Sequence, residues 1–155
     1  MDQHKASYIR TSFPESISDV SADTEPLWGK MNVQQMVEHV TGFFKVSTDQ
    51  IRFPTVTPEE HLPKYKEFLL SDKQFRENTK APVLPEEPLP IREPDLNTAK
   101  ARLKEAIENF FTFYELHPDT KIAHPVFGPL NFEEWILLHY KHVTHHARQF
   151  GLLPR

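Results

Sequence analysis

Apolar residues recur at helical spacing along the last quarter of the chain, over residues 131–149. Asn131 and Glu134 form the pattern of a capping box, which predicts the start of this helix. Gly151 predicts its end, because glycine readily adopts the backbone conformation that terminates helices. The stripe on one face consists of Trp135, Leu138, His142 and Gln149.

Two further stretches have apolar residues at the same helical spacing. Asn32 and Gln35 repeat the capping-box pattern before a second apolar face. A third helix is expected from Asp95 to just before Pro118, because proline disfavours helix at the residue that precedes it. Its stripe is the longest in the chain: Leu96, Ala99, Leu103, Ala106, Ile107, Phe110 and Phe113.

The remaining segments give weaker patterns. Residues 58–72 indicate a helix with Pro63 in its first turns, and 13–20 a short one with Pro14 at its start. Residues 82–90 are rich in proline and predict an extended connector between the second and third core helices. Alternating patterns typical of strands are scarce, so the sequence predicts an all-α helical bundle.

The composition narrows the class of protein. The length of 155 residues predicts a single domain over residues 1–155, and the formal charge of −4 offers no basic surface for nucleic acid. No apolar run is long enough to cross a bilayer, so no membrane partner is expected. The absence of cysteine excludes disulfides and thiolate ligands and agrees with a cytoplasmic protein. Nine histidines stand out, and they cluster near the C-terminus.

Within residues 139–146, four histidines offer several pairs at ligand spacing. His142 and His146 are four apart, so on a helix they point the same way and can reach one metal ion. Spacing alone also admits His139 with His142, and His142 with His145. The apolar stripe favours the first pair, because it turns them towards the core and leaves His139 and His145 on opposite flanks.

A metal site needs a ligand from another helix, and His39 is the best candidate. It lies three residues after Met36 and four before Phe43, at the edge of the second apolar face. Helix bundles bring such faces together and often hold metals in their cores. Three neutral imidazoles with open positions resemble a catalytic site more than a closed structural one.

Simpler roles explain most other candidate residues. We expect His4, His61 and His117 to be solvated, while His124 either lines the mouth of a cavity or serves a turn. The acidic residues near the histidines are expected to be solvated or capping, and the aromatic residues to be core; these are Glu38, Glu133, Glu134, Trp28, Phe43, Phe44, Phe110, Phe113 and Trp135. Phosphate loops, nucleophile elbows and the His-Glu-x-x-His motif are absent, so no catalytic residue can be assigned.

Two separated motifs resemble a subfamily of unassigned function in the DinB-like superfamily. One is Trp28-Gly29-Lys30-Met31, followed by Gln35-Met36-Val37-Glu38-His39; the other runs from His124-Pro125-Val126-Phe127-Gly128-Pro129 to His145-His146-Ala147-Arg148-Gln149-Phe150-Gly151. The matches span residues 24–44 and 124–152 in the order found in that subfamily.

The resemblance implies a four-helix bundle that binds a divalent metal, most simply zinc or nickel, through His39, His142 and His146. Characterised relatives use the metal to activate a low-molecular-weight thiol for transfer or isomerisation. Others have been described as hydrolases, and many are homodimers. The chain departs from its relatives at residues 1–23, which supply little of the expected long first helix, so closure of the bundle is open.

Together these patterns lead to two alternative functions. The first is a metal-dependent enzyme, a thiol transferase, isomerase or hydrolase, in which a metal-activated thiol or water attacks an electrophilic small molecule. The second is a non-catalytic, stress-related binding protein that keeps the bundle and a structural metal.

Overall fold

The computed structural model describes residues 1–155, and three of its helices are those that the apolar stripes predict. They are α3 (Val33–Ser47), α5 (Leu96–Leu116) and α6 (Phe132–Gln149). The expected capping boxes are present at the starts of α3 and α6, where Asn32 and Asn131 each accept a backbone N–H. Asp95 caps α5 in the same way. The prediction of these helices is confirmed.

The first bundle helix is longer than the sequence suggested. It consists of three consecutive helical segments, α1 (Gln3–Ser7), the π-helical turn η1 (Tyr8–Ser12) and α2 (Phe13–Ser18). The short helix expected near Pro14 is therefore only its last part, and the expectation that residues 1–23 supply little helix was wrong. Pro14 explains the π turn, because proline has no N–H and its ring clashes with the carbonyl four residues earlier. The widened turn accommodates it, and Phe13 N–H donates to the Tyr8 carbonyl, five residues back.

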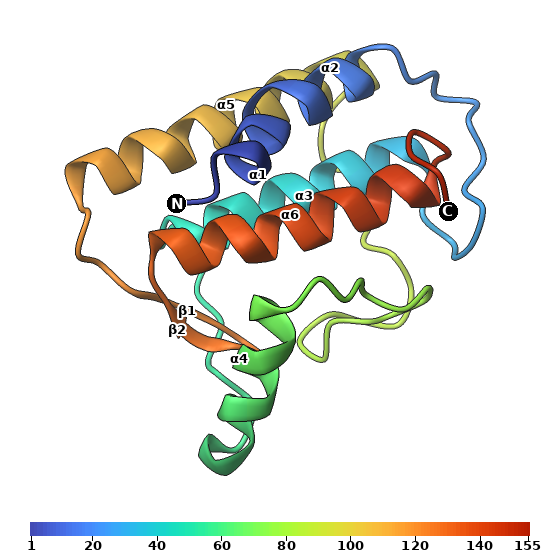
Figure 1. Ribbon diagram of the computed structural model, residues 1–155. Coiled ribbons are helices and arrows are strands. Elements are labelled where there is room, and N and C mark those ends of the chain that lie inside the picture. Colours follow the sequence, from blue (N-terminus) through green and yellow to red (C-terminus); the bar gives the residue numbers. More distant parts are fainter.

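The four helical units pack around one core as a bundle. In Figure 1, α3 and α6 lie side by side, with α5 and the N-terminal helix above them. The contacts form a closed ring, since α3 packs on α5, α5 on α2, α1 on α6 and α6 on α3. The first helix contributes Ala6, Ile9, Phe13 and Ile17, each at most 5% exposed. These four positions are three or four residues apart, and they close the bundle.

A second tier covers the other side of α3 and α6. It contains the short helix η2 (Glu59–His61), α4 (Leu62–Leu70) and a hairpin of β1 (Ile122–His124) and β2 (Gly128–Leu130). The helix expected over 58–72 is thus confirmed in its central part, whereas the hairpin was missed. Each strand has only three residues, too few for an alternating pattern to be recognised. Gly128 has a φ of +75°, which explains glycine at the turn.

The Pro-rich connector, residues 71–95, completes this tier without helix or strand, as expected for its central part. A buried charged residue holds it near each end. At the start, Lys141 on α6 donates to the carbonyls of Ser71 and Lys73 at 2.7 and 2.5 Å. At the end, the Glu38 carboxylate on α3 accepts the backbone N–H groups of Arg92 and Glu93 at 2.8 and 3.3 Å. The connector is therefore attached to both helices that carry the candidate ligands.

No helix combines the length and the apolar character that a bilayer-spanning segment requires.

Candidate metal centre

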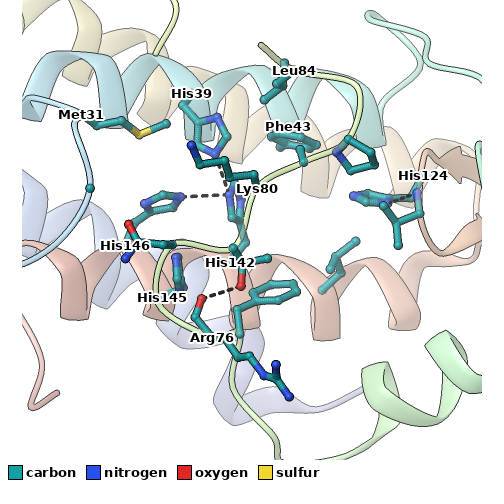
Figure 2. A pocket seen from close by; sticks show the side chains of 18 of the residues that line it. Met31, His39, Phe43, Arg76, Lys80, Leu84, His124, His142, His145 and His146 are labelled. Atoms are coloured by element: carbon teal, nitrogen blue, oxygen red, sulfur yellow. Dashed lines mark hydrogen bonds between the residues drawn. The ribbon is translucent and has the colours of Figure 1, made fainter. Parts of the chain in front are cut away.

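The packing of α3 against α6 brings together the three histidines that the sequence singled out. His39 comes from α3, and His142 and His146 lie one turn apart on α6 (Figure 2). The Nε2 atom of His142 is 2.9 Å from that of His39 and 3.1 Å from that of His146. The candidate ligand atoms of the three side chains all lie within 4.8 Å of one another. Three imidazole nitrogens thus converge on one small volume.

This arrangement fits a small divalent cation. Nitrogens that share a tetrahedral zinc ion at about 2.0–2.1 Å stand about 3.3 Å apart. The two short Nε2–Nε2 distances, 2.9 and 3.1 Å, come within half an ångström of that spacing. A neutral imidazole has only one N–H, so three converging nitrogens cannot all be satisfied by one another. A cation would satisfy all three lone pairs at once.

Gln149 fixes which nitrogen of His146 can bind. Its amide N–H donates to the Trp28 carbonyl at 3.0 Å, which turns its Oε1 towards Nδ1 of His146 at 2.7 Å. An oxygen can only accept there, so Nδ1 carries the proton and Nε2 presents its lone pair to the other histidines. Trp28 and Gln149 belong to the two separate sequence motifs, and this contact joins them.

The same three side chains are neutral at physiological pH. Burial, assisted by nearby His145, lowers the pKa of His39 to about 4. Burial also holds the pKa of His142 and His146 well below the usual value, and neighbouring histidines add to the effect. A neutral imidazole is the form that binds metal, so no proton has to be displaced at pH 7.

His139 and His145, the two histidines of α6 outside the triad, have different environments. His139 is only 1% exposed, and its ring stacks on Phe44 with centroids 3.9 Å apart. Its Nε2 lies 2.9 Å from the Ser47 hydroxyl, so it is a satisfied core residue, and its placement on a flank was wrong. The reason is that α6 is covered on several sides rather than one. His145 packs its ring against Trp28 and Phe75 beside the triad.

The remaining histidines agree with the simpler roles. His4, His61 and His117 are exposed, as expected. His124 serves both of the roles considered for it, because its Nδ1 accepts the N–H groups of Val126 and Phe127 in the hairpin turn while its ring lines a cavity. Burial lowers its pKa to about 3.

The histidine triad opens into a large cavity of about 1800 Å³ between the bundle and the second tier (Figure 2). Its walls include Trp28, Phe43 and Trp135, so these three aromatic residues belong to the cavity as well as to the packing of the protein. The connector supplies another wall, with Leu84, Lys80 and Arg76 among its lining residues.

Two expectations about acidic residues have different outcomes. Glu134 caps α6, as its position suggested, and it also pairs with Lys66, a contact that the sequence did not predict. Glu38 is not solvated, since it is 6% exposed and holds the end of the connector. Its role could not be found from the sequence, because its partners are backbone groups more than fifty residues away. With its oxygens so engaged, Glu38 is not free to act as a general base.

Comparison with protein-family models gives one finding that bears on this site. The model of the DinB superfamily matches residues 11–150, which include all three histidines and the four bundle helices except the first part of the N-terminal one. Neither the curated proteins nor the solved structures contain a significant match. Because the family match covers most of the chain, the protein belongs to the DinB superfamily.

Proposed function

We propose that the protein is a metal-dependent enzyme whose ion is held by His39, His142 and His146. The observation that supports the proposal is the convergence of three neutral Nε2 atoms at the wall of a large cavity. Such a donor set suits zinc or nickel, and an ion held by only these three histidines would also accept a thiol or water from the cavity. When bound, the ion supplies Lewis-acid chemistry, which lowers the pKa of a thiol or water so that its anion can attack an electrophile.

The side chains around the triad each have a definite task in this proposal. Gln149 holds His146 in the tautomer that presents Nε2. Phe43 packs edge-on against both His39 and His142, with centroids 5.2 and 5.1 Å away, which restricts the rotation of the two rings. Phe43 also places an apolar surface beside the triad, and a lower local dielectric constant strengthens electrostatic interactions there. The substrate is a small molecule that enters from the cavity, and a low-molecular-weight thiol is the co-substrate favoured by the resemblance.

The first experiment addresses the ligand set. Metal content is measured by mass spectrometry for the purified protein and for His142→Ala, His146→Ala and His39→Ala. We expect about one divalent ion per chain in the parent protein and a large loss in each variant. His117→Ala is the matched control, because His117 is exposed and does not line the cavity. Unchanged metal content in the three variants would contradict the ligand set.

The second experiment separates an enzyme from a binding protein. The metal-loaded protein is incubated with common thiols and a fluorogenic electrophile, and both turnover and melting temperature are recorded. We expect thiols to raise the melting temperature and turnover to require the metal. A bound metal without turnover, and without any thiol-dependent shift, would favour the non-catalytic alternative. Size-exclusion chromatography with light scattering tests the expected homodimer.

A further inference from the structure

The charges around the cavity differ in sign from those of the whole protein. The chain has 22 acidic and 18 basic residues, a formal charge of −4. The cavity lining, by contrast, includes six lysines and arginines and only four aspartates and glutamates. A positive cavity in a negative protein concentrates anions at its mouth, because low-dielectric walls focus the field.

Pairing inside the lining leaves all of the excess positive charge unneutralised. Three basic residues are neutralised by acidic ones at 2.6 to 3.7 Å; the pairs are Lys30–Glu87, Lys80–Glu86 and Arg92–Glu38. The side chains of Lys64, Lys73 and Arg76 form no ion pair and no hydrogen bond. Asp72 is the single unpaired acidic residue of the lining. The unpaired cations lie on α4 and on the first part of the connector.

The wall beside these cations is aromatic. Phe68 lies 5.5 Å from Phe75 and 6.3 Å from Phe127, and Tyr65 lies 5.9 Å from Phe127, all measured between ring centroids. All four rings line the cavity. Tyr65 follows Lys64 directly, and Phe75 precedes Arg76 directly, so each of the two segments carries a cationic residue next to an aromatic one in the sequence. An aromatic wall next to free cations is complementary to an amphipathic anion.

The first part of the connector is fixed rather than free to swing away. Lys141 is 7% exposed and donates to two carbonyls on either side of Asp72. Its ammonium also lies over the Phe68 ring, 4.7 Å from the centroid. This contact joins the connector, α4 and α6 at one point. The backbone that carries Lys73 is therefore held beside α4 before any ligand arrives, which reduces the entropic cost of binding.

We propose that the cavity binds an anionic amphipath, a small molecule with an aromatic or aliphatic body and one carboxylate, sulfonate or phosphate group. The body packs on the wall formed by Tyr65, Phe68, Phe75 and Phe127, and the anionic group lies at the rim near Lys64, Lys73 and Arg76. This inference rests on the proposed function only in placing the reactive part of the molecule at the histidine triad. The binding of the anion itself does not require the metal.

The test uses two fluorescent probes that share an aromatic body, anilinonaphthalene sulfonate as the anion and N-phenylnaphthylamine as its neutral counterpart. The variant replaces Lys64, Lys73 and Arg76 together by glutamine. The matched control replaces Lys104, Lys121 and Arg52 by glutamine. These are also two lysines and one arginine, and they lie outside the cavity lining, so the net charge changes equally. All six side chains belong to exposed residues, so both proteins are expected to fold.

We expect the variant to bind the sulfonate about fivefold more weakly than the parent protein, with unchanged affinity for the neutral probe. Raising the salt from about 20 mM to about 500 mM should weaken sulfonate binding to the parent protein but not to the variant. The control should behave like the parent. Equal loss for both probes, no loss for the sulfonate, or binding of neither probe would overturn the inference.

Probe titrations of His142→Ala, together with its metal content, distinguish this inference from the proposed function. If the ligand set is wrong but the anion site is right, His142→Ala keeps the metal content of the parent protein. It then still binds the sulfonate more tightly than the neutral probe. If the anion proposal fails, the sulfonate preference is absent although the triad still binds metal.

Discussion

Nδ1 of His146 lies 2.7 Å from Oε1 of Gln149, whose amide nitrogen donates to the Trp28 carbonyl at 3.0 Å. One amide therefore connects the loop before α3 to a candidate ligand on α6. Gly29, with a φ of +77°, allows the loop to approach closely, since a Cβ there would stand 3.1 Å from the Gln149 nitrogen. This close approach therefore explains both the glycine of the first motif and the glutamine of the second.

This contact predicts the effect of Gln149→Ala on metal binding. Without the acceptor, His146 can rotate or adopt the other tautomer, so we expect metal affinity to fall about 10- to 100-fold. Competition with a chromogenic chelator measures the affinity. Gln3→Ala is the control, because Gln3 is exposed on α1. An affinity equal to that of the parent protein would mean that Gln149 does not orient the ligand.

Glu38 leads to a prediction about the connector. Replacement by alanine leaves the N–H groups of Arg92 and Glu93 without their acceptor, so we expect the protein to lose about 1–3 kcal/mol of unfolding free energy. Limited proteolysis should then cut within residues 71–95 faster than in the parent protein. Glu105→Ala is the control, since Glu105 is exposed and pairs only with Arg102 at the surface. Similar losses in the two variants would argue against a special role for Glu38.

The sequence predicts the bundle well where one apolar face and a polar cap coincide, as at Asn131 and Glu134. It predicts less where contacts between distant elements decide which residues are buried. His139 shares its face of α6 with Trp135, Ile136 and Val143, but the sequence alone does not show that Phe44 and Ser47 on α3 enclose that face. The first helix has the buried series Ala6, Ile9, Phe13 and Ile17, a signal that Pro14 and the surrounding polar residues conceal.

The residues of the candidate site likewise differ in how far the sequence alone indicates them. The four-residue spacing of His142 and His146 is a local property of a helix, so the sequence can indicate it. The contribution of His39 depends on how α3 lies against α6, and spacing offered it only as the best candidate. The contacts of Glu38 and Gln149 run to backbone groups of remote loops, and no pattern of side chains encodes such partners. The aromatic wall on α4 likewise depends on the position of the hairpin.

Acid stability provides a prediction that is independent of the metal. His124 has a pKa of about 3 when folded, below the value of about 6.5 expected when unfolded. Between these values the unfolded chain binds a proton that the folded protein does not, so stability falls as the pH decreases below about 6.5. Above that pH the residue has no effect on the pH dependence of stability.

The variant that checks this is His124→Asn. Its Oδ1 can accept the N–H groups of Val126 and Phe127 in place of Nδ1, but it does not titrate. Urea unfolding of metal-free protein between about pH 6 and pH 4 should show a dependence flatter by about 1.4 kcal/mol per pH unit. His117→Asn, at an exposed position, should keep the parent slope. Equal slopes in all three proteins would mean that His124 protonates freely in the folded state.

The N-terminal helix, whose apolar pattern Pro14 conceals in the sequence, contributes Ile17 to the core of the bundle. Ile17 is 1% exposed in the core, so Ile17→Ala removes buried apolar groups and should cost about 2–5 kcal/mol of unfolding free energy. Ile91→Ala, at a residue 50% exposed on the connector, should cost much less and is the control. Chemical denaturation of both variants measures the difference. Because α2 packs on both α5 and α6, a large and selective loss for Ile17 would mean that the N-terminal helix is an integral part of the bundle that positions His142 and His146.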